Sequence, residues 1–248
     1  MCIFEIIAKR NFEGLKRIVE ENPQSINIKN EWKRSPLDVA IICGNLQMAK
    51  FLFEKDGRPN LETYCDGKWT PIHSAACNNG DISTLRWVFE KGILPPSVLN
   101  TRSCPEEWTP LDCVIAYGKP EIAQFLFEKG ARPDLEIYCD EKFTTPVHNA
   151  ARNGKTATLK WVFENGILPL TVLNVEDFYH WTPLDLAIGK NERETAALLR
   201  RLLYVEPVFL AMQRAKRDRR CVLRRLPDEL LDWVVDEVAA RHHLEVVW

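Results

Sequence analysis

The sequence predicts an all-α solenoid, a stack of helix-turn-helix units joined by extended loops. One phrase, Ser or Thr, then Pro, an apolar residue and Asp or His, occurs five times, opening at Ser35, Thr70, Thr109, Thr145 and Thr182. The prolines of consecutive phrases lie 35, 39, 36 and 37 residues apart, a spacing typical of stacked repeats. Two short segments with apolar residues at helical spacing follow each phrase.

The first 30 residues predict two helices that lack the opening phrase. Apolar residues cluster at 3–8 and again at 15–19. A terminal unit of a stack has one polar outer face, so we expect residues 2–30 to form a capping repeat.

Each opening phrase predicts the start of a helix. The Ser or Thr hydroxyl suits the N-cap, and the proline after it suits the first helical position. The first helix is short and rich in small residues, and Gly44, Gly80 and Gly154 fit a left-handed position after its end. The second helix follows at once, for example over residues 46–55 and 84–92.

A longer period overlies the short one. Residues 51–55, Phe-Leu-Phe-Glu-Lys, return as residues 125–129, so the duplicated unit is a pair of repeats. The loops alternate accordingly between a shorter class containing Arg-Pro-Asn/Asp-Leu-Glu and a longer class containing Gly-Ile-Leu-Pro.

The unit resembles the ankyrin repeat, whose opening motif is T-P-L-H-x-A. The nearest copies run from Thr70 to Ala75 and from Thr145 to Ala150, and the other three phrases carry Asp in place of His. The resemblance covers residues 2–204, about six units, and implies that His73 and His148 bond to nearby loop backbone rather than act in catalysis.

The resemblance also implies where a protein partner binds, because ankyrin stacks expose their loop tips and first helices as a concave face. The expected contact residues are aromatic and charged residues of the tips: Trp32, Lys68, Trp69, Glu107, Trp108, Lys142, Phe143, Tyr179 and Trp181. Tryptophan is enriched at interface hot spots. The alternative is that these rings brace the loops against one another.

Composition and motifs argue against other function classes. A net charge of -2 over 248 residues makes nucleic acid an unlikely partner. The sequence has no phosphate-binding loop, no G-x-S-x-G and no H-E-x-x-H motif, so we expect no catalytic, cofactor or metal site. It also has no signal-peptide pattern and no run long enough to span a membrane, so we expect a cytoplasmic protein.

After residue 204 the repeat pattern stops, and residues 205–248 predict a separate helical tail. A basic run, Arg214–Arg225, is typical of a solvated helix face and is also compatible with a nuclear-localisation signal. Residues 226–238 then predict an amphipathic helix, with Leu230, Val234 and Val238 on one stripe.

The start of this helix, Leu-Pro-Asp-Glu-Leu-Leu, is similar to the opening of an F-box, and the order of repeats and tail is similar to the poxviral PRANC architecture. That similarity implies docking to a ubiquitin-ligase adaptor through Leu226, Pro227, Leu230, Leu231 and Val234. The alternative is that the helix folds back over the last repeat and shields residues 198, 199 and 202.

The sequence therefore predicts a non-catalytic module that binds one or more proteins through its loop tips and concave helices. The alternative function is a substrate receptor of a cullin-type ubiquitin ligase, in which the repeats hold the target and the tail holds the ligase. A scaffold without a ligase link is not distinguished from the first of these.

Overall fold

A computed structural model describes residues 2–60, 70–77, 81–103, 107–135 and 144–205. All regular secondary structure in these residues is helical, which confirms the predicted all-α class. The chain divides into two compact units, Met1–Ile137 and Tyr138–Trp248, and each is described by itself.

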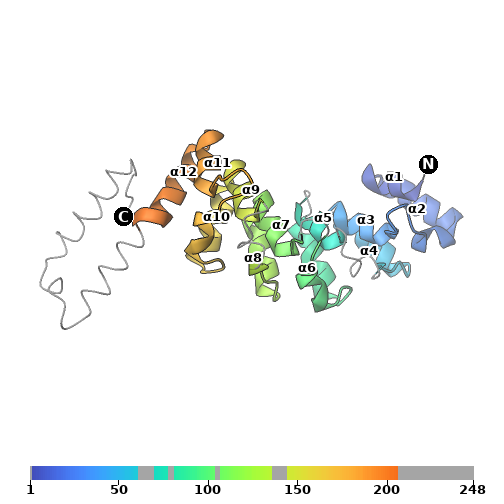
Figure 1. Cartoon of the computed structure of the whole chain (residues 1–248). Helices are drawn as coiled ribbons and strands as arrows, with labels where there is room; N and C mark the ends of the chain where they lie inside the picture. Colours follow the sequence, from blue (N-terminus) through green and yellow to red (C-terminus); the bar gives the residue numbers. More distant parts are fainter. Residues whose placement is uncertain (1, 61–69, 78–80, 104–106, 136–143, 206–248) are drawn as a thin grey trace, which may run out of the picture. The chain divides into compact units, whose positions relative to one another are not determined.

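The described part of the first unit contains four consecutive helix pairs (Figure 1). Their bounds are α1 (Ile3–Ala8), α2 (Phe12–Glu21), α3 (Pro36–Ile42), α4 (Leu46–Glu54), α5 (Pro71–Cys77), α6 (Ile82–Glu90), α7 (Pro110–Tyr117) and α8 (Pro120–Glu128). First helices pack on first helices, α1 on α3, α3 on α5 and α5 on α7, and second helices α2, α4, α6 and α8 pack in the same order. This is the predicted stack of helix-turn-helix units.

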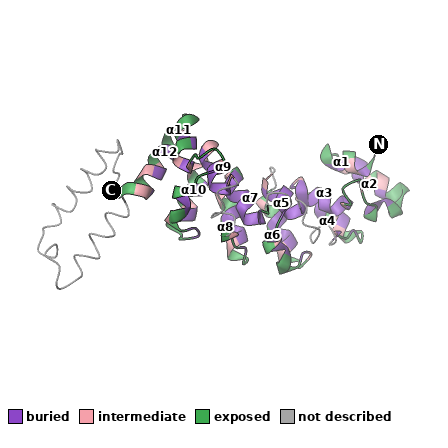
Figure 2. Cartoon of the chain, in the orientation of Figure 1, coloured by how far each residue is buried: buried purple, intermediate pink, exposed green. Residues whose placement is uncertain are grey.

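The first helices hold most of the core of this unit. The side chains of Leu37, Ile41, Ile72, Ala75 and Leu111 are fully buried. Figure 2 shows the same contrast, with α3, α5 and α7 largely buried and the outer ends of α6 and α8 exposed. Small and branched residues on the first helices allow neighbouring pairs to approach closely.

Every opening phrase begins a helix, as the sequence predicts. At α3 the Ser35 hydroxyl accepts a hydrogen bond from the Asp38 amide (3.2 Å), and the Asp38 carboxylate accepts one from the Ser35 amide (2.8 Å). The same reciprocal capping box is present at α5, α7 and the two later openings. Loss of such a cap typically costs about 1 kcal/mol of stability.

Glycines end the first helices in left-handed backbone, as predicted for Gly44 (φ 62°) and Gly154 (φ 64°). Gly118 has the same conformation (φ 79°), whereas Asn191 takes this position in the last pair (φ 61°). The third predicted glycine, Gly80, lies outside the described residues.

The second unit contains two further helix pairs among its described residues. They are α9 (Pro146–Arg152) with α10 (Thr156–Glu164), and α11 (Pro183–Gly189) with α12 (Arg193–Arg200). The first helix α9 packs on α11, and the second helix α10 packs on α12. A π-helical turn, η6 (Arg201–Val205), follows α12 directly.

The loops of the longer class share a structural feature. Each longer loop contains a 3-10 helix, η3 (Pro96–Asn100) or η5 (Leu170–Asn174), and the loop after α2 contains a similar one, η1 (Pro23–Asn27). In the shorter loops, residues 55–60 contain no 3-10 turn, whereas Leu135, the last described residue of the second one, has 3-10 conformation. The predicted division into a repeat domain, 1–204, and a helical tail, 205–248, stays a prediction, because the tail beyond residue 205 lies outside the described residues.

Candidate protein-binding surface

The two histidines of the opening phrases fix the loop tips of the following repeats. Both are fully buried, and the Nδ1 of each accepts a hydrogen bond from its own cap amide, Thr70 or Thr145 (both 3.3 Å). With Nδ1 as acceptor, the proton lies on Nε2 of each ring. His73 Nε2 then donates to the carbonyl of Trp108 (2.8 Å), and His148 Nε2 to that of Trp181 (3.0 Å).

The aspartates at the same position bind a different atom of the following loop. Asp38 accepts from the amide of Asn60 (3.0 Å), and Asp112 from the amide of Asp134 (3.1 Å). A carboxylate can only accept, whereas the imidazole supplies an N–H. The alternation of Asp and His therefore matches the alternation of loops, because shorter loops present an amide and longer ones a carbonyl.

Burial lowers the pKa of His148, and the nearby Arg152 adds to this effect. The carboxylate of Asp177 and the carbonyls of Trp181 and Val175 act in the opposite direction. The net direction agrees with a neutral ring that accepts at Nδ1 and donates at Nε2. His148 is therefore a structural residue in the described geometry, as the resemblance implied.

Two of the loop tips, before α3 and before α11, are tight turns locked by a side chain. In the second unit the Asp177 amide donates to the Trp181 carbonyl (3.0 Å), while Asp177 Oδ1 accepts from the amides of Tyr179 (2.9 Å) and Trp181 (3.1 Å). His180 takes a left-handed conformation within the turn (φ 60°). The backbone that carries the aromatic rings is thus fixed before any partner arrives.

The tip before α3 is built in the same way. Asn30 Oδ1 accepts from the amides of Trp32 (3.0 Å) and Arg34 (2.9 Å), and Lys33 is the left-handed residue (φ 57°). In this register Trp32 corresponds to Tyr179, not to Trp181. The sequence gives the same correspondence, since Trp32 and Tyr179 each lie three residues before the opening Ser or Thr.

The aromatic residues predicted at the tips fall into two groups. Trp32, Tyr179 and Trp181 are 65%, 69% and 50% exposed. Trp108 differs from the expectation, because its ring is only 7% exposed. A buried ring cannot offer its face to a partner, so Trp108 fits the alternative bracing role, and only Glu107 beside it is exposed.

One exposed ring was missed by the sequence reasoning. Phe178 is 70% exposed and meets the Tyr179 ring edge to face, with centroids 5.4 Å apart. The signal available was its place in the aromatic run at residues 178–181, of which only part was selected. Three exposed rings therefore lie on one turn of the second unit.

The remaining predicted contact residues, Lys68, Trp69, Lys142 and Phe143, lie outside the described residues. The predicted adaptor-docking residues of the tail also lie outside them. Among the residues that the structure does describe, no cluster of three or more His, Cys, Asp or Glu could hold a metal ion. No helix in the described part is long and apolar enough to cross a membrane.

These features define a stacked helical repeat protein whose loops are held by bonds between repeats. The family model of ankyrin repeats (three copies) matches residues 3–97 and 58–137, together more than half of the chain. The chain therefore belongs to the ankyrin-repeat family.

Individual relatives are more distant. The chain is 26% identical over 196 residues to a Saccharomyces cerevisiae protein named "Probable 26S proteasome regulatory subunit p28", covering 77% of this chain and 80% of that protein. It is 30% identical over 126 residues to cyclin-dependent kinase 4 inhibitor B of Rattus norvegicus, covering 51% of this chain and 88% of that protein.

A solved structure shares the fold. It is a chain from the complex of a predatory endopeptidase of Bdellovibrio bacteriovorus with its immunity protein, with a TM-score of 0.55 at 20% identity. The likeness covers 80% of this chain and 96% of that chain.

Proposed function

We propose that this protein is a non-catalytic module that binds a protein partner through its loop tips and the adjoining first helices. Ankyrin-repeat proteins are typically protein-protein interaction modules, which supports a role in protein binding. The observation that favours the loop tips as the binding surface is the exposed aromatic tip of the second unit, Phe178, Tyr179 and Trp181.

An exposed aromatic cluster on a rigid turn has the properties of a binding site. Burying one such side chain in an interface stabilises a complex by about 1.5–3 kcal/mol, and aromatic residues dominate interface hot spots. The Asp177 bonds fix the turn in advance, which lowers the conformational entropy lost on binding. The partner's surface should therefore present an apolar pocket to this tip.

The relatives suggest where to look for the partner. The match to p28 spans most of both chains, and the name of that protein places it with the 26S proteasome. The kinase inhibitor relative covers about half of this chain. We propose that the 26S proteasome is the first partner to test and cyclin-dependent kinase 4 the second.

The test is paired affinity capture with the full-length chain. The variant Phe178→Ala/Tyr179→Ala/Trp181→Ala should lose a partner that the wild type retains, because the exposed rings are removed. The tip itself should survive, since His148 bonds to the main-chain carbonyl of residue 181 and not to its ring.

The matched control is Tyr204→Ala, which removes an exposed aromatic residue in η6, outside the tip residues 177–181. It should retain the partner at the wild-type level. Equal capture by the triple variant and the wild type, measured by quantitative mass spectrometry, would exclude the tip as the binding surface.

A further inference from the structure

The last helix pair has an open end face. Ile188 in α11 is 49% exposed. Counting from the opening phrase, its counterparts in the four preceding repeats are Ile41, Ala76, Ile115 and Ala151, and all four are fully buried. The apolar position that every earlier repeat covers is thus left uncovered in the last one, within the described residues.

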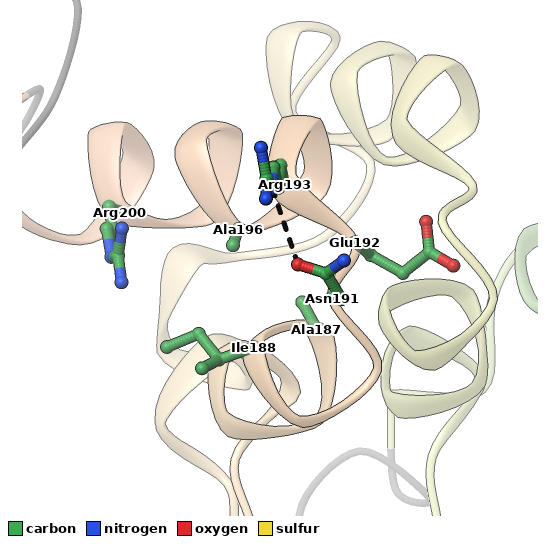
Figure 3. A pocket seen from close by; sticks show the side chains of 7 residues that line it. All are labelled: Ala187, Ile188, Asn191, Glu192, Arg193, Ala196 and Arg200. Carbon is green, nitrogen blue, oxygen red and sulfur yellow. Dashed lines mark hydrogen bonds between the residues drawn. The ribbon is translucent and has the colours of Figure 1, made fainter.

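The second helix of this pair also differs in sequence from the second helices of the earlier repeats. At the place of Arg200 the four preceding repeats carry phenylalanine, at residues 53, 89, 127 and 163. Arg200 and Arg193 line a shallow pocket with Ile188 and Ala196 (Figure 3). The open face therefore combines an apolar centre with a basic border formed by the two arginines, and Glu192 also lines the pocket.

In earlier repeats a two-residue clamp holds the backbone of the shorter loop. In the first clamp, Asn27 Nδ2 donates to the Asp56 carbonyl (3.1 Å), and its Oδ1 accepts from the Arg58 amide (2.9 Å). Two residues further along this loop, the Asn60 amide donates to Asp38 (3.0 Å).

The second clamp repeats this arrangement. Asn100 donates to the Gly130 carbonyl (3.3 Å) and accepts from the Arg132 amide (2.8 Å). The Asp134 amide then donates to Asp112 (3.1 Å). Each clamp forms hydrogen bonds with three main-chain groups of an extended segment that contains a proline.

A third clamp is present in the sequence but has no shorter loop to hold. Its residues are Asn174 and Asp185, and η6 follows α12 where the loop would begin. Within the described residues, Asp185 accepts only from the amide and hydroxyl of Thr182, and its side chain is exposed. The last pair thus keeps the residues that bind an extended strand of chain.

We infer that residues 226–238 of this chain's own tail dock on the end face of α11 and α12. The tail starts directly after η6, and the 20 residues from 206 to 225 can span up to roughly 65 Å when extended, ample to return to this face.

The chemistry of the segment matches the chemistry of the face. Its apolar stripe, with Leu230 and Val234, suits the exposed Ile188. Its acidic residues suit the basic border and are Asp228, Glu229, Asp232, Asp236 and Glu237. The basic run before it would be repelled by the same border.

The start of the segment also matches the clamp. The clamped loops read Arg-Pro-Asn at residues 58–60 and Arg-Pro-Asp at residues 132–134. The tail reads Leu-Pro-Asp at residues 226–228, which places an amide directly after a proline, with Leu226 at the position of the clamped arginine. The Asp228 amide is the donor that Asp185 would bind.

Peptide-resolved alkylation of full-length Ile188→Cys tests this inference without truncating the chain. Cysteine at position 188 should react at least about tenfold more slowly than in a chain that also carries Leu230→Asp/Val234→Asp, since covered positions react only after local opening. The control Ile28→Cys, at a 42% exposed position in the first unit, should react fast in both backgrounds.

A second variant tests the docking from the opposite side. Arg193→Glu/Arg200→Glu leaves the tail intact but reverses the charge of the border, and it should raise the rate at position 188 to a similar degree. An unchanged rate in either variant would overturn the inference and favour a tail that docks elsewhere, for instance on a ligase adaptor. Protection that grows with protein concentration would also overturn it, in favour of a second copy of the chain.

Discussion

At the scale of single residues, the fourth position of each of the first four opening phrases selects which main-chain atom of the next loop is bound. His73 and His148 donate to carbonyls, whereas Asp38 and Asp112 accept from amides. The structural role of the histidines was predictable from the motif. Their partners were not, since the bonded atoms of His73 and Trp108 lie 35 residues apart in the sequence.

This residue-scale account predicts a pH dependence of stability. Because the pKa of His148 is lowered from 6.5 in the folded chain, the unfolded chain binds a proton first as the pH falls. The free energy of unfolding should therefore decrease as the pH drops from about 7 through 6.5 towards the folded pKa. Urea unfolding at a series of pH values measures this decrease.

The control variant is His148→Gln, which keeps a donor and an acceptor but does not titrate. The difference between the wild type and this variant removes the contributions of other groups. A difference that stays constant over this pH range would contradict a neutral, buried His148.

At the scale of elements, the loop tips show what local sequence does and does not encode. Trp108 and Trp181 are each followed by Thr-Pro-Leu-Asp, yet Trp108 is buried and Trp181 is half exposed. The five-residue sequence encodes the cap and the helix start, which are the same in both. Burial depends on side chains from other parts of the chain. The sequence therefore placed both residues at tips but did not show that one is buried and the other exposed.

This difference predicts unequal effects of two matched substitutions. Trp108→Ala should lower the free energy of unfolding by about 3–5 kcal/mol, because it removes a large buried side chain. Trp181→Ala should cost about 1 kcal/mol or less, as its ring is half exposed and its bonded carbonyl is main chain. Denaturant unfolding of both variants compares them, and equal losses would contradict the assigned roles.

At the scale of the whole molecule, the repeat period made most of the described fold predictable. Units of a stacked repeat contact mainly their neighbours, so the structure inferred for one repeat also holds for the next. The helix starts, the left-handed glycines at Gly44 and Gly154 and the two loop classes followed from this period. The last pair departs from the period at Arg200 and after α12, and there the pattern no longer predicted the contacts.

The central claim is that the exposed aromatic tip of the second unit binds a protein. Hydroxyl-radical footprinting of the full-length chain, alone and with its captured partner, tests this most directly. We expect oxidation of Phe178, Tyr179 and Trp181 to fall at least about tenfold in the complex, because rings buried at an interface core lose contact with solvent. Unchanged oxidation of these three residues in a formed complex would contradict the claim.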